Sequence, residues 1–236
     1  MSLYMLHLEL EPRPLYEWAR QGGLDTRDRG YLVHSAMRAA FGKAAPQPFA
    51  VFGNARNPRL KVLGYAERGR EALLPGLALA EPVLAATFPE AVLDERALPD
   101  RFPAEGEFGF RVECCPVTRC TMPDGKQREK DAFLAACDAR PEGGVERADV
   151  YVAWLAAELA RGGGAELLDG AMQGFQLFTP VRRGDAKGAK GMGRRPRAAL
   201  TGRLRVREPG AFGALLARGI GRHRAFGLGM LLLRPV

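Results

Sequence analysis

Patterns typical of strands and helices follow one another in a similar order in both halves of the chain, and this repetition most narrows the possible folds. The first half is expected to contain a strand, a helix, two short strands and a second helix, over residues 3–10, 27–41, 48–53, 60–66 and 70–97. The first strand carries Leu6, Leu8 and Leu10 on one side. We expect Asp25 or Thr26 to cap the helix that follows it.

The second half repeats this arrangement. It is expected to contain a strand, a helix, two strands, a short helix and a last strand, over residues 107–117, 148–161, 174–181, 199–206, 209–217 and 226–233. Each half therefore has the elements of one α+β unit of roughly 100 residues. We predict an α+β protein with tandem ferredoxin-like domains of the RRM type, residues 1–104 and 105–236, and a glycine-rich loop near the C-terminus.

The composition is that of an ordinary folded protein. Of 236 residues, 47% are hydrophobic and 26% are charged, which argues against a disordered chain. No run of about 18 uncharged apolar residues occurs, and the N-terminus lacks the pattern of a secretion signal. We therefore expect a cytoplasmic protein. The four cysteines form no Cys-x-x-Cys pair, so we expect reduced thiols and neither a metal site nor a cofactor.

Positive charge is concentrated toward the C-terminus. The whole chain has 35 Lys and Arg against 27 Asp and Glu, a net charge of +8. Residues 182–224 contain 13 of these basic residues and only two acids, Asp185 and Glu208, so this segment carries +11 and the remainder −3. A near-neutral body with one basic segment indicates a polyanionic partner, most often nucleic acid. The alternative is a solvated basic face that binds nothing.

One face of the helix expected over 27–41 carries side chains suited to chemistry. Arg27, Tyr31, His34 and Arg38 are spaced by four, three and four residues and so share that face. An imidazole can move a proton near neutral pH, and a guanidinium can stabilise a phosphate that gains charge. These groups suffice to cleave RNA without metal, through attack of the ribose 2′-hydroxyl on its own phosphate. We expect Tyr31, His34 and Arg38 to be catalytic and Arg27 to bind RNA; the alternative is a half-buried Tyr–His pair that packs on the sheet.

Four glycines bracket three consecutive basic residues in the segment 219–229, between the last helix and the last strand. Glycine lets a backbone approach a phosphate closely, and the basic side chains supply charge. The residues expected to contact RNA here are Gly219, Gly221, Arg222, His223 and Arg224. The alternative is a tight turn with solvated arginines.

A basic loop precedes this segment. Its basic residues, all expected to bind RNA, are Arg182, Arg183, Lys187, Lys190, Arg194, Arg195 and Arg197. Aromatic residues do not interleave with them, so we expect the loop to follow the groove or backbone of an RNA duplex, without stacking on single-stranded bases. A disordered, solvated loop is the alternative.

Together these motifs resemble a known family. The run from Arg218 to Arg222, followed by Ala225-Phe226-Gly227-Leu228-Gly229, resembles the glycine-rich loop of the CRISPR repeat-RNA endoribonucleases, of which the type I-E branch (CasE or Cse3) is the best match. Tyr31-Leu32-Val33-His34 is similar to the Tyr-x-x-His of that branch's first helix. The expected strand from Phe110 and the helix from Val152 also resemble elements of the family, in the same order along nearly the whole chain.

The resemblance implies a protein that binds the stem-loop of a CRISPR repeat and cuts at the 3′ base of the hairpin without metal. The products would carry 5′-hydroxyl and 2′,3′-cyclic phosphate ends, and the protein would keep the processed RNA and join a Cascade-type complex. It implies that His34 is the general acid or base and that Tyr31 orients the 2′-hydroxyl. It also implies that the basic loop enters the RNA groove.

Three alternatives stay open beside the resemblance. A non-catalytic subunit could hold an RNA hairpin with the same fold. A related type IV processing enzyme has different active-site residues, which would give the arginines more weight than Tyr31 and His34. His223 could be a second proton carrier or a phosphate contact. Residues 120–144 do not align with the family pattern.

Overall fold

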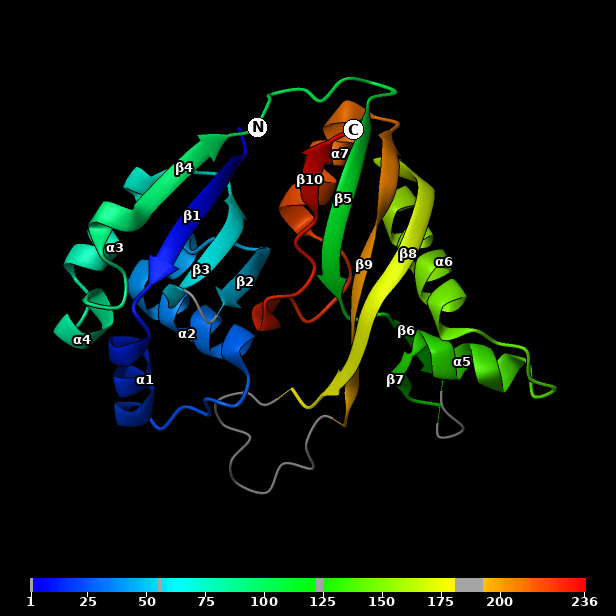
Figure 1. Ribbon diagram of the computed structural model, residues 1–236, viewed down its shortest axis with the longest axis horizontal. Coiled ribbons are helices and arrows are strands. Elements are labelled where there is room, and N and C mark those ends of the chain that lie inside the picture. The colour runs from blue at the N-terminus through cyan, green and yellow to red at the C-terminus, as the bar shows by residue number, and fades with distance from the viewer. Residues whose placement is uncertain (1, 55–56, 122–124, 181–192) are drawn as a thin grey trace.

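The structure, a computed structural model, describes residues 2–54, 57–121, 125–180 and 193–236, and contains two four-stranded antiparallel sheets that lie side by side (Figure 1). The first sheet has the order β2-β3-β1-β4. Its strands are β1 (Tyr4–Leu10), β2 (Phe49–Asn54), β3 (Asn57–Ala66) and β4 (Leu93–Ala97). Leu6, Leu8 and Leu10 point from β1 into the core of this half and are fully buried, as their alternation predicts.

The second sheet repeats the topology of the first. Its order is β10-β5-β9-β8, with strands β5 (Glu107–Cys114), β8 (Ala165–Phe178), β9 (Arg195–Val206) and β10 (Leu232–Pro235). In both sheets the first strand in the chain lies between the third and the fourth, and helices connect strands one to two and three to four. This is the ferredoxin-like arrangement, present twice, so the predicted fold class is confirmed. The division at residue 104 stays a prediction.

The helices cover the sheets and include the two that the sequence indicated best. They are α1 (Pro12–Gln21), α2 (Arg29–Phe41), α3 (Leu74–Ala78), α4 (Pro82–Ala85), α5 (Ala132–Ala139), α6 (Arg147–Ala160) and α7 (Pro209–Arg218). α2 and α6 agree with the expected helices to within two residues at each end. The cap of α2 is Asp28, whose side chain accepts a hydrogen bond from the Tyr31 N–H, so the expectation of Asp25 or Thr26 was wrong.

Three regions differ from the sequence-based expectation. Residues 70–97, expected as a helix with irregular flanks, contain two short helices followed by β4, because Pro75 and Pro82 each lie in the first turn of a new helix. α1 was not expected. β6 (Val117–Thr121) and β7 (Gln127–Asp131) pair as a separate two-stranded sheet, and α5 follows.

The last strand is shorter than expected. β10 begins at Leu232 and not at Phe226, which lies in a short 3-10 turn, η4 (Arg224–Phe226). β8 begins at Ala165, earlier than expected. The glycine-rich segment is therefore a loop along most of its length, and Figure 1 shows it passing between the two sheets (orange to red).

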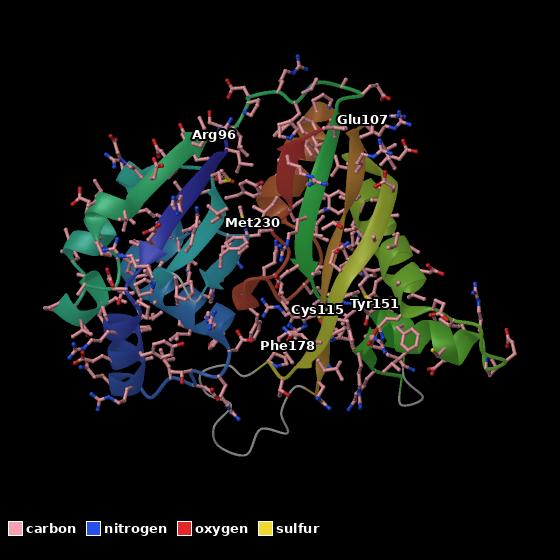
Figure 2. The ribbon with its side chains drawn as sticks, viewed as in Figure 1. Arg96, Glu107, Cys115, Tyr151, Phe178 and Met230 are labelled. Carbon is pink, nitrogen blue, oxygen red and sulfur yellow. The ribbon has the colours of Figure 1, made fainter. Side chains whose placement is uncertain are left out.

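The two halves pack against each other through the face of the first sheet that is opposite its own core. Leu3 and Tyr65 belong to the hydrophobic core of the second half, together with Met230 and Leu231. The Tyr65 hydroxyl donates a hydrogen bond of 2.8 Å to the Leu231 carbonyl. Figure 2 shows Met230 between the two sheets. Among the described residues, no helix has the length and apolar content needed to cross a membrane.

Candidate functional site

The first turn of α2 lies directly on the glycine-rich loop. A Cβ atom on Gly30 would come within 2.0 Å of the Phe226 carbonyl oxygen, so only glycine permits this approach. Asp28 caps the same turn, with 2.8 Å from its Oδ1 to the Tyr31 nitrogen. Asp28 thus sets the first residue of α2, and Gly30 allows the helix to contact the backbone of the glycine-rich loop.

Tyr31 and His34 are held next to each other on this helix. Their ring centroids lie 6.2 Å apart, with an angle of 34° between the rings. Tyr31 stacks on Phe226 at 5.3 Å, and His34 stacks on Phe49 of β2 at 6.2 Å. Both side chains are half-buried. Each of the two rings therefore rests on a phenylalanine at the junction of the two halves. A phenol can orient a hydroxyl group, and an imidazole can transfer a proton.

The two other predicted residues of this helix face lie on either side of that pair. Arg38 is one turn beyond His34, about 6 Å further along the helix axis. It is exposed and lines a separate hollow of about 270 Å³ with Lys43 and Arg68. Arg27 precedes the helix, and its Nε is 2.9 Å from Oδ2 of Asp25, which lowers the pKa of that carboxyl.

Hydrogen bonds within the protein fix the backbone of the glycine-rich loop. The Ile220 N–H donates to the Gly229 carbonyl at 2.8 Å, and the Gly229 N–H donates to the Glu113 carbonyl of β5 at 2.7 Å. Gly229 has a φ of +86°, and a Cβ there would lie 2.5 Å from the Ile220 oxygen. Gly219 is buried and Gly221 is half-buried against Trp154. Arg224 donates to the Arg218 carbonyl, so its guanidinium already has one partner in the protein.

Glu129 of β7 gathers three predicted RNA-binding residues around one carboxylate. His223 Nε2 lies 2.9 Å from its Oε2, Arg222 Nε pairs with its Oε1, and Arg195 Nε lies 3.5 Å from Oε2. Burial opposes ionisation of the Glu129 carboxyl, but the hydrogen bond with His223 and the two neighbouring guanidiniums outweigh burial and lower its pKa. Sequence reasoning did not find Glu129, because 94 positions separate it from His223.

A groove runs between the start of α2 and the ends of β8 and β9. It has a volume of about 510 Å³, and Arg27, Arg29, Phe178 and Arg197 are among the residues that line it. Arg197 forms a hydrogen bond of 2.9 Å with Glu113 through its Nε. Figure 2 shows Phe178 close to the end of the second sheet. The groove therefore combines basic side chains with aromatic ones, because Tyr16 and Phe226 line it as well as Phe178.

Acidic residues of neighbouring strands neutralise most of the arginines in the remainder of β9. Arg203 Nε is 2.6 Å from Oδ2 of Asp169 on β8, and Arg205 Nη2 is 2.7 Å from Oε1 of Glu107 on β5. Arg207, just after β9, pairs with Glu166 at 2.7 Å. The concentration of positive charge along residues 182–224 of the sequence is thus partly balanced in space. This face of the sheet is a ladder of opposite charges.

The remaining residues predicted to bind RNA lie in the basic loop before β9. Arg194 is exposed at the start of β9. Arg182, Arg183, Lys187 and Lys190 lie outside the described residues. Within the described part of the chain, no group of three or more His, Cys, Asp or Glu side chains is arranged to hold a metal ion.

The fold and the site together define a protein of two ferredoxin-like halves, in which a glycine-rich loop of the second half packs against a Tyr–His pair of the first. A family model described as CRISPR associated protein matches residues 3–235, and the chain belongs to this family. No curated protein matches the sequence significantly.

Solved structures of similar fold are members of CRISPR systems. The CRISPR endoribonuclease Cse3 bound to a 19-nucleotide RNA has a TM-score of 0.67 and 18% identity, with 100% of each chain covered. Thermus thermophilus Cse3, bound to an RNA that represents a pre-cleavage complex, has a TM-score of 0.62, 19% identity and the same 100% coverage of both chains. A chain of a CRISPR RNA-guided surveillance complex has a TM-score of 0.59 and 16% identity, again over 100% of each chain.

Proposed function

We propose that the protein is an endoribonuclease that binds the stem-loop of CRISPR repeat RNA and cleaves the precursor at the 3′ base of the hairpin. The observation that carries this proposal is the half-buried Tyr31–His34 pair, held against the glycine-rich loop by the close contact of Gly30 with Phe226. Membership of the CRISPR-associated family supplies the substrate class. Two similar structures are of Cse3 bound to RNA.

The chemistry follows from general acid–base catalysis. The 2′-hydroxyl at the cut site attacks the adjacent phosphate, and the bond from phosphorus to the 5′-oxygen breaks. The imidazole of His34 takes up or delivers a proton, and the Tyr31 hydroxyl orients the nucleophile. The products are a 2′,3′-cyclic phosphate and a 5′-hydroxyl. Because the nucleophile belongs to the RNA and the proton carriers to the protein, the reaction needs no metal ion.

The RNA is held by basic groups around the junction. The groove beside α2 offers Arg27 and Arg197, and Arg194 lies exposed where β9 begins. With the basic loop 182–197, these groups would bind the phosphates of the stem, and binding would weaken as salt increases. Arg38 lies one helical turn beyond His34 on the same face of α2, so its guanidinium can stabilise the charge that the cleaved phosphate gains.

We infer that the protein keeps its product and acts as a subunit of a Cascade-type complex in the cytoplasm. The similarity to a chain of a CRISPR RNA-guided surveillance complex supports this inference. The protein would keep the cleaved RNA because cleavage occurs at one end of the hairpin and leaves the contacts with the stem phosphates in place.

A second candidate function is that of a non-catalytic subunit that holds an RNA hairpin. The stacking of both rings on phenylalanines favours it, because a packing role explains this arrangement equally well. The two functions differ in whether the RNA is cut.

The test uses a labelled repeat hairpin and the same RNA with a single 2′-deoxy nucleotide at the cut site. Cleavage of the first RNA, with 2′,3′-cyclic phosphate ends, and none of the second is the result expected. Tight binding of both RNAs without cleavage would instead establish the hairpin-binding subunit. Cleavage of both at equal rates would exclude the 2′-hydroxyl as nucleophile.

A further inference from the structure

The β6–β7 hairpin contacts the glycine-rich loop through an apolar contact of Val117 and through the charged side chain of Glu129. This carboxylate is 16% exposed and interacts with His223 and Arg222 of the loop and with Arg195 at the start of β9. The hairpin belongs to neither four-stranded sheet. Glu129 thus connects three segments that are distant in the sequence: the hairpin, the loop, and the strand that follows the basic loop.

His223 is buried and has an unusual backbone conformation. Its side chain is only 5% exposed, and its φ is +61°, a left-handed value that a residue with a Cβ rarely adopts. Phe178 and Phe226 enclose the imidazole, with centroid distances of 6.3 and 6.0 Å. Nδ1 is buried and has no hydrogen-bond partner among the described residues, so the contact with Glu129 is the polar contact that fixes the ring.

A series of ring contacts connects this anchor to the candidate catalytic pair. His223 packs on Phe226, Phe226 stacks on Tyr31 at 5.3 Å, and Tyr31 lies beside His34. The Phe226 N–H also donates to the His223 carbonyl at 2.9 Å, so the two residues form one turn of the loop. Moving His223 would therefore move the surface on which Tyr31 rests.

We propose that Glu129 is a positioning residue for RNA cleavage: it holds His223, and through Phe226 it sets the position of the Tyr31 hydroxyl. This inference rests on the proposed function. It makes the buried His223 a structural anchor of the loop and not a second proton carrier. Glu129 does not touch the RNA, so its loss affects the cleavage step more than the binding step.

The test compares Glu129→Ala and Glu129→Gln with the wild type in single-turnover cleavage at saturating protein, with hairpin affinity measured separately. We expect Glu129→Ala to slow cleavage about 10- to 100-fold, because a small displacement of a catalytic group has such effects, while affinity stays within about threefold. Glutamine keeps an oxygen that accepts from His223 Nε2–H, so Glu129→Gln should recover much of the rate. It is also the variant that preserves the fold if alanine does not.

A matched control comes from the same part of the fold. Asp138 of α5 pairs with Lys130 of β7 but is not in the Glu129 cluster, so Asp138→Asn should cleave at the wild-type rate. Wild-type rates in Glu129→Ala would overturn the inference. Equal losses in the glutamine and alanine variants would overturn the hydrogen-bonded anchor, and an affinity loss as large as the rate loss would overturn the separation of the two steps.

A double-mutant cycle with Tyr31→Phe tests the path of contacts. If Glu129 acts through the Tyr31 hydroxyl, removal of this hydroxyl should make most of the Glu129→Ala effect disappear. Fully additive effects would overturn the path. Failure of the proposed function has a different signature. If the wild type does not cleave the hairpin, both the proposed function and this inference are wrong. If the wild type and Glu129→Ala cleave at the same rate, only this inference is wrong.

Discussion

At the scale of single residues, Gly30 has the most restricted position in the candidate site. It lies in the first turn of α2, where the Phe226 carbonyl leaves no space for a Cβ atom. Glycine inside a helix is less favourable than alanine by about 1 kcal/mol, but here it permits a backbone contact between the two halves. That contact brings Phe226 under the ring of Tyr31.

Replacing Gly30 by alanine should therefore separate α2 from the loop. We expect Gly30→Ala to reduce stability by about 1–3 kcal/mol, the usual cost of overpacking, and to slow RNA cleavage. Gly213 is the matched control, because it lies in α7 and no heavy atom comes within 4 Å of a Cβ placed there. Gly213→Ala should leave cleavage unchanged and raise stability by up to about 1 kcal/mol. Thermal unfolding and single-turnover rates measure both; equal behaviour of the two variants would contradict the account.

The cysteines form two classes with different reactivity. Burial raises the pKa of the Cys115 thiol to about 12 and that of Cys114 well above its ordinary value, so neither forms thiolate at neutral pH. Cys120 and Cys137 are half-buried. We expect an alkylating reagent to modify Cys120 and Cys137 first in the folded protein, as mass spectrometry of time points would show. Early modification of Cys114 or Cys115 would contradict the packing described around β5 and β6.

The candidate site shows what the sequence could predict at this scale. The spacing of Tyr31 and His34 places both on one helix face, and the structure brings the two rings together. Phe226, Phe49 and Glu129 contact that site from segments far away in the sequence, and no local pattern marks them. The roles of all these residues stay predictions.

At the scale of elements, β9 determines how much of the basic segment is available to RNA. Three arginines of this region, Arg203, Arg205 and Arg207, pair with carboxylates of β8, of β5 and of the turn before β5. Charge counted along the sequence therefore overestimates the charge that faces a ligand. Strand pairing brings together acidic and basic residues that are separated by up to 102 positions in the sequence.

This pairing predicts different salt responses for two arginines. Arg194→Gln should make the dependence of hairpin affinity on salt less steep by about 0.7–0.9 in the log–log slope, the value for one phosphate contact. Arg203→Gln should leave the slope unchanged, because its guanidinium already pairs with Asp169. Binding titrations at several salt concentrations measure both slopes. A larger change in slope for Arg203→Gln than for Arg194→Gln would contradict this prediction, because it would mean that Arg203 leaves Asp169 and contacts a phosphate when RNA binds.

The attachment of the β6–β7 hairpin should depend on pH. The pKa of Glu129 is lowered from 4.5 in the folded protein, so its contribution to stability is present above pH 4.5 and is lost as the pH falls through the lower, folded-state value. We expect the difference in Tm between wild type and Glu129→Gln to be constant above that pH and to shrink below it. A difference that grows on acidification would contradict this sign.

Sequence patterns identified the elements best where one face of an element packs on its own sheet. The stripes of α2 and α6 and the alternation of β1 are of this kind, and all three were found. β4 was missed because four of its five residues, Leu93 excepted, are exposed, which leaves no buried alternation to detect. The β6–β7 hairpin was missed for a related reason: most of its residues are polar and few are buried, so no buried alternation marks its strands.

At the scale of the whole molecule, two ferredoxin-like halves form one site at their junction. Tyr65 of β3 hydrogen-bonds to Leu231 next to the glycine-rich loop, and Gly30 of α2 touches Phe226 within it. Figure 1 shows that this loop lies between the sheets, where both halves contact it. The repeated order of elements, together with the family resemblance, predicted the fold, whereas the packing of one half on the other depends on contacts that a single sequence does not reveal.

The central claim is that this junction cleaves RNA by proton transfer through His34. The most direct measurement is a single-turnover reaction with a labelled repeat hairpin in EDTA, with wild type beside His34→Ala and with affinity measured in parallel. We predict that the wild type cleaves without metal and that His34→Ala loses at least about 100-fold in rate, with affinity within a few fold. Equal cleavage by the two proteins, or a strict requirement for Mg²⁺, would contradict the account.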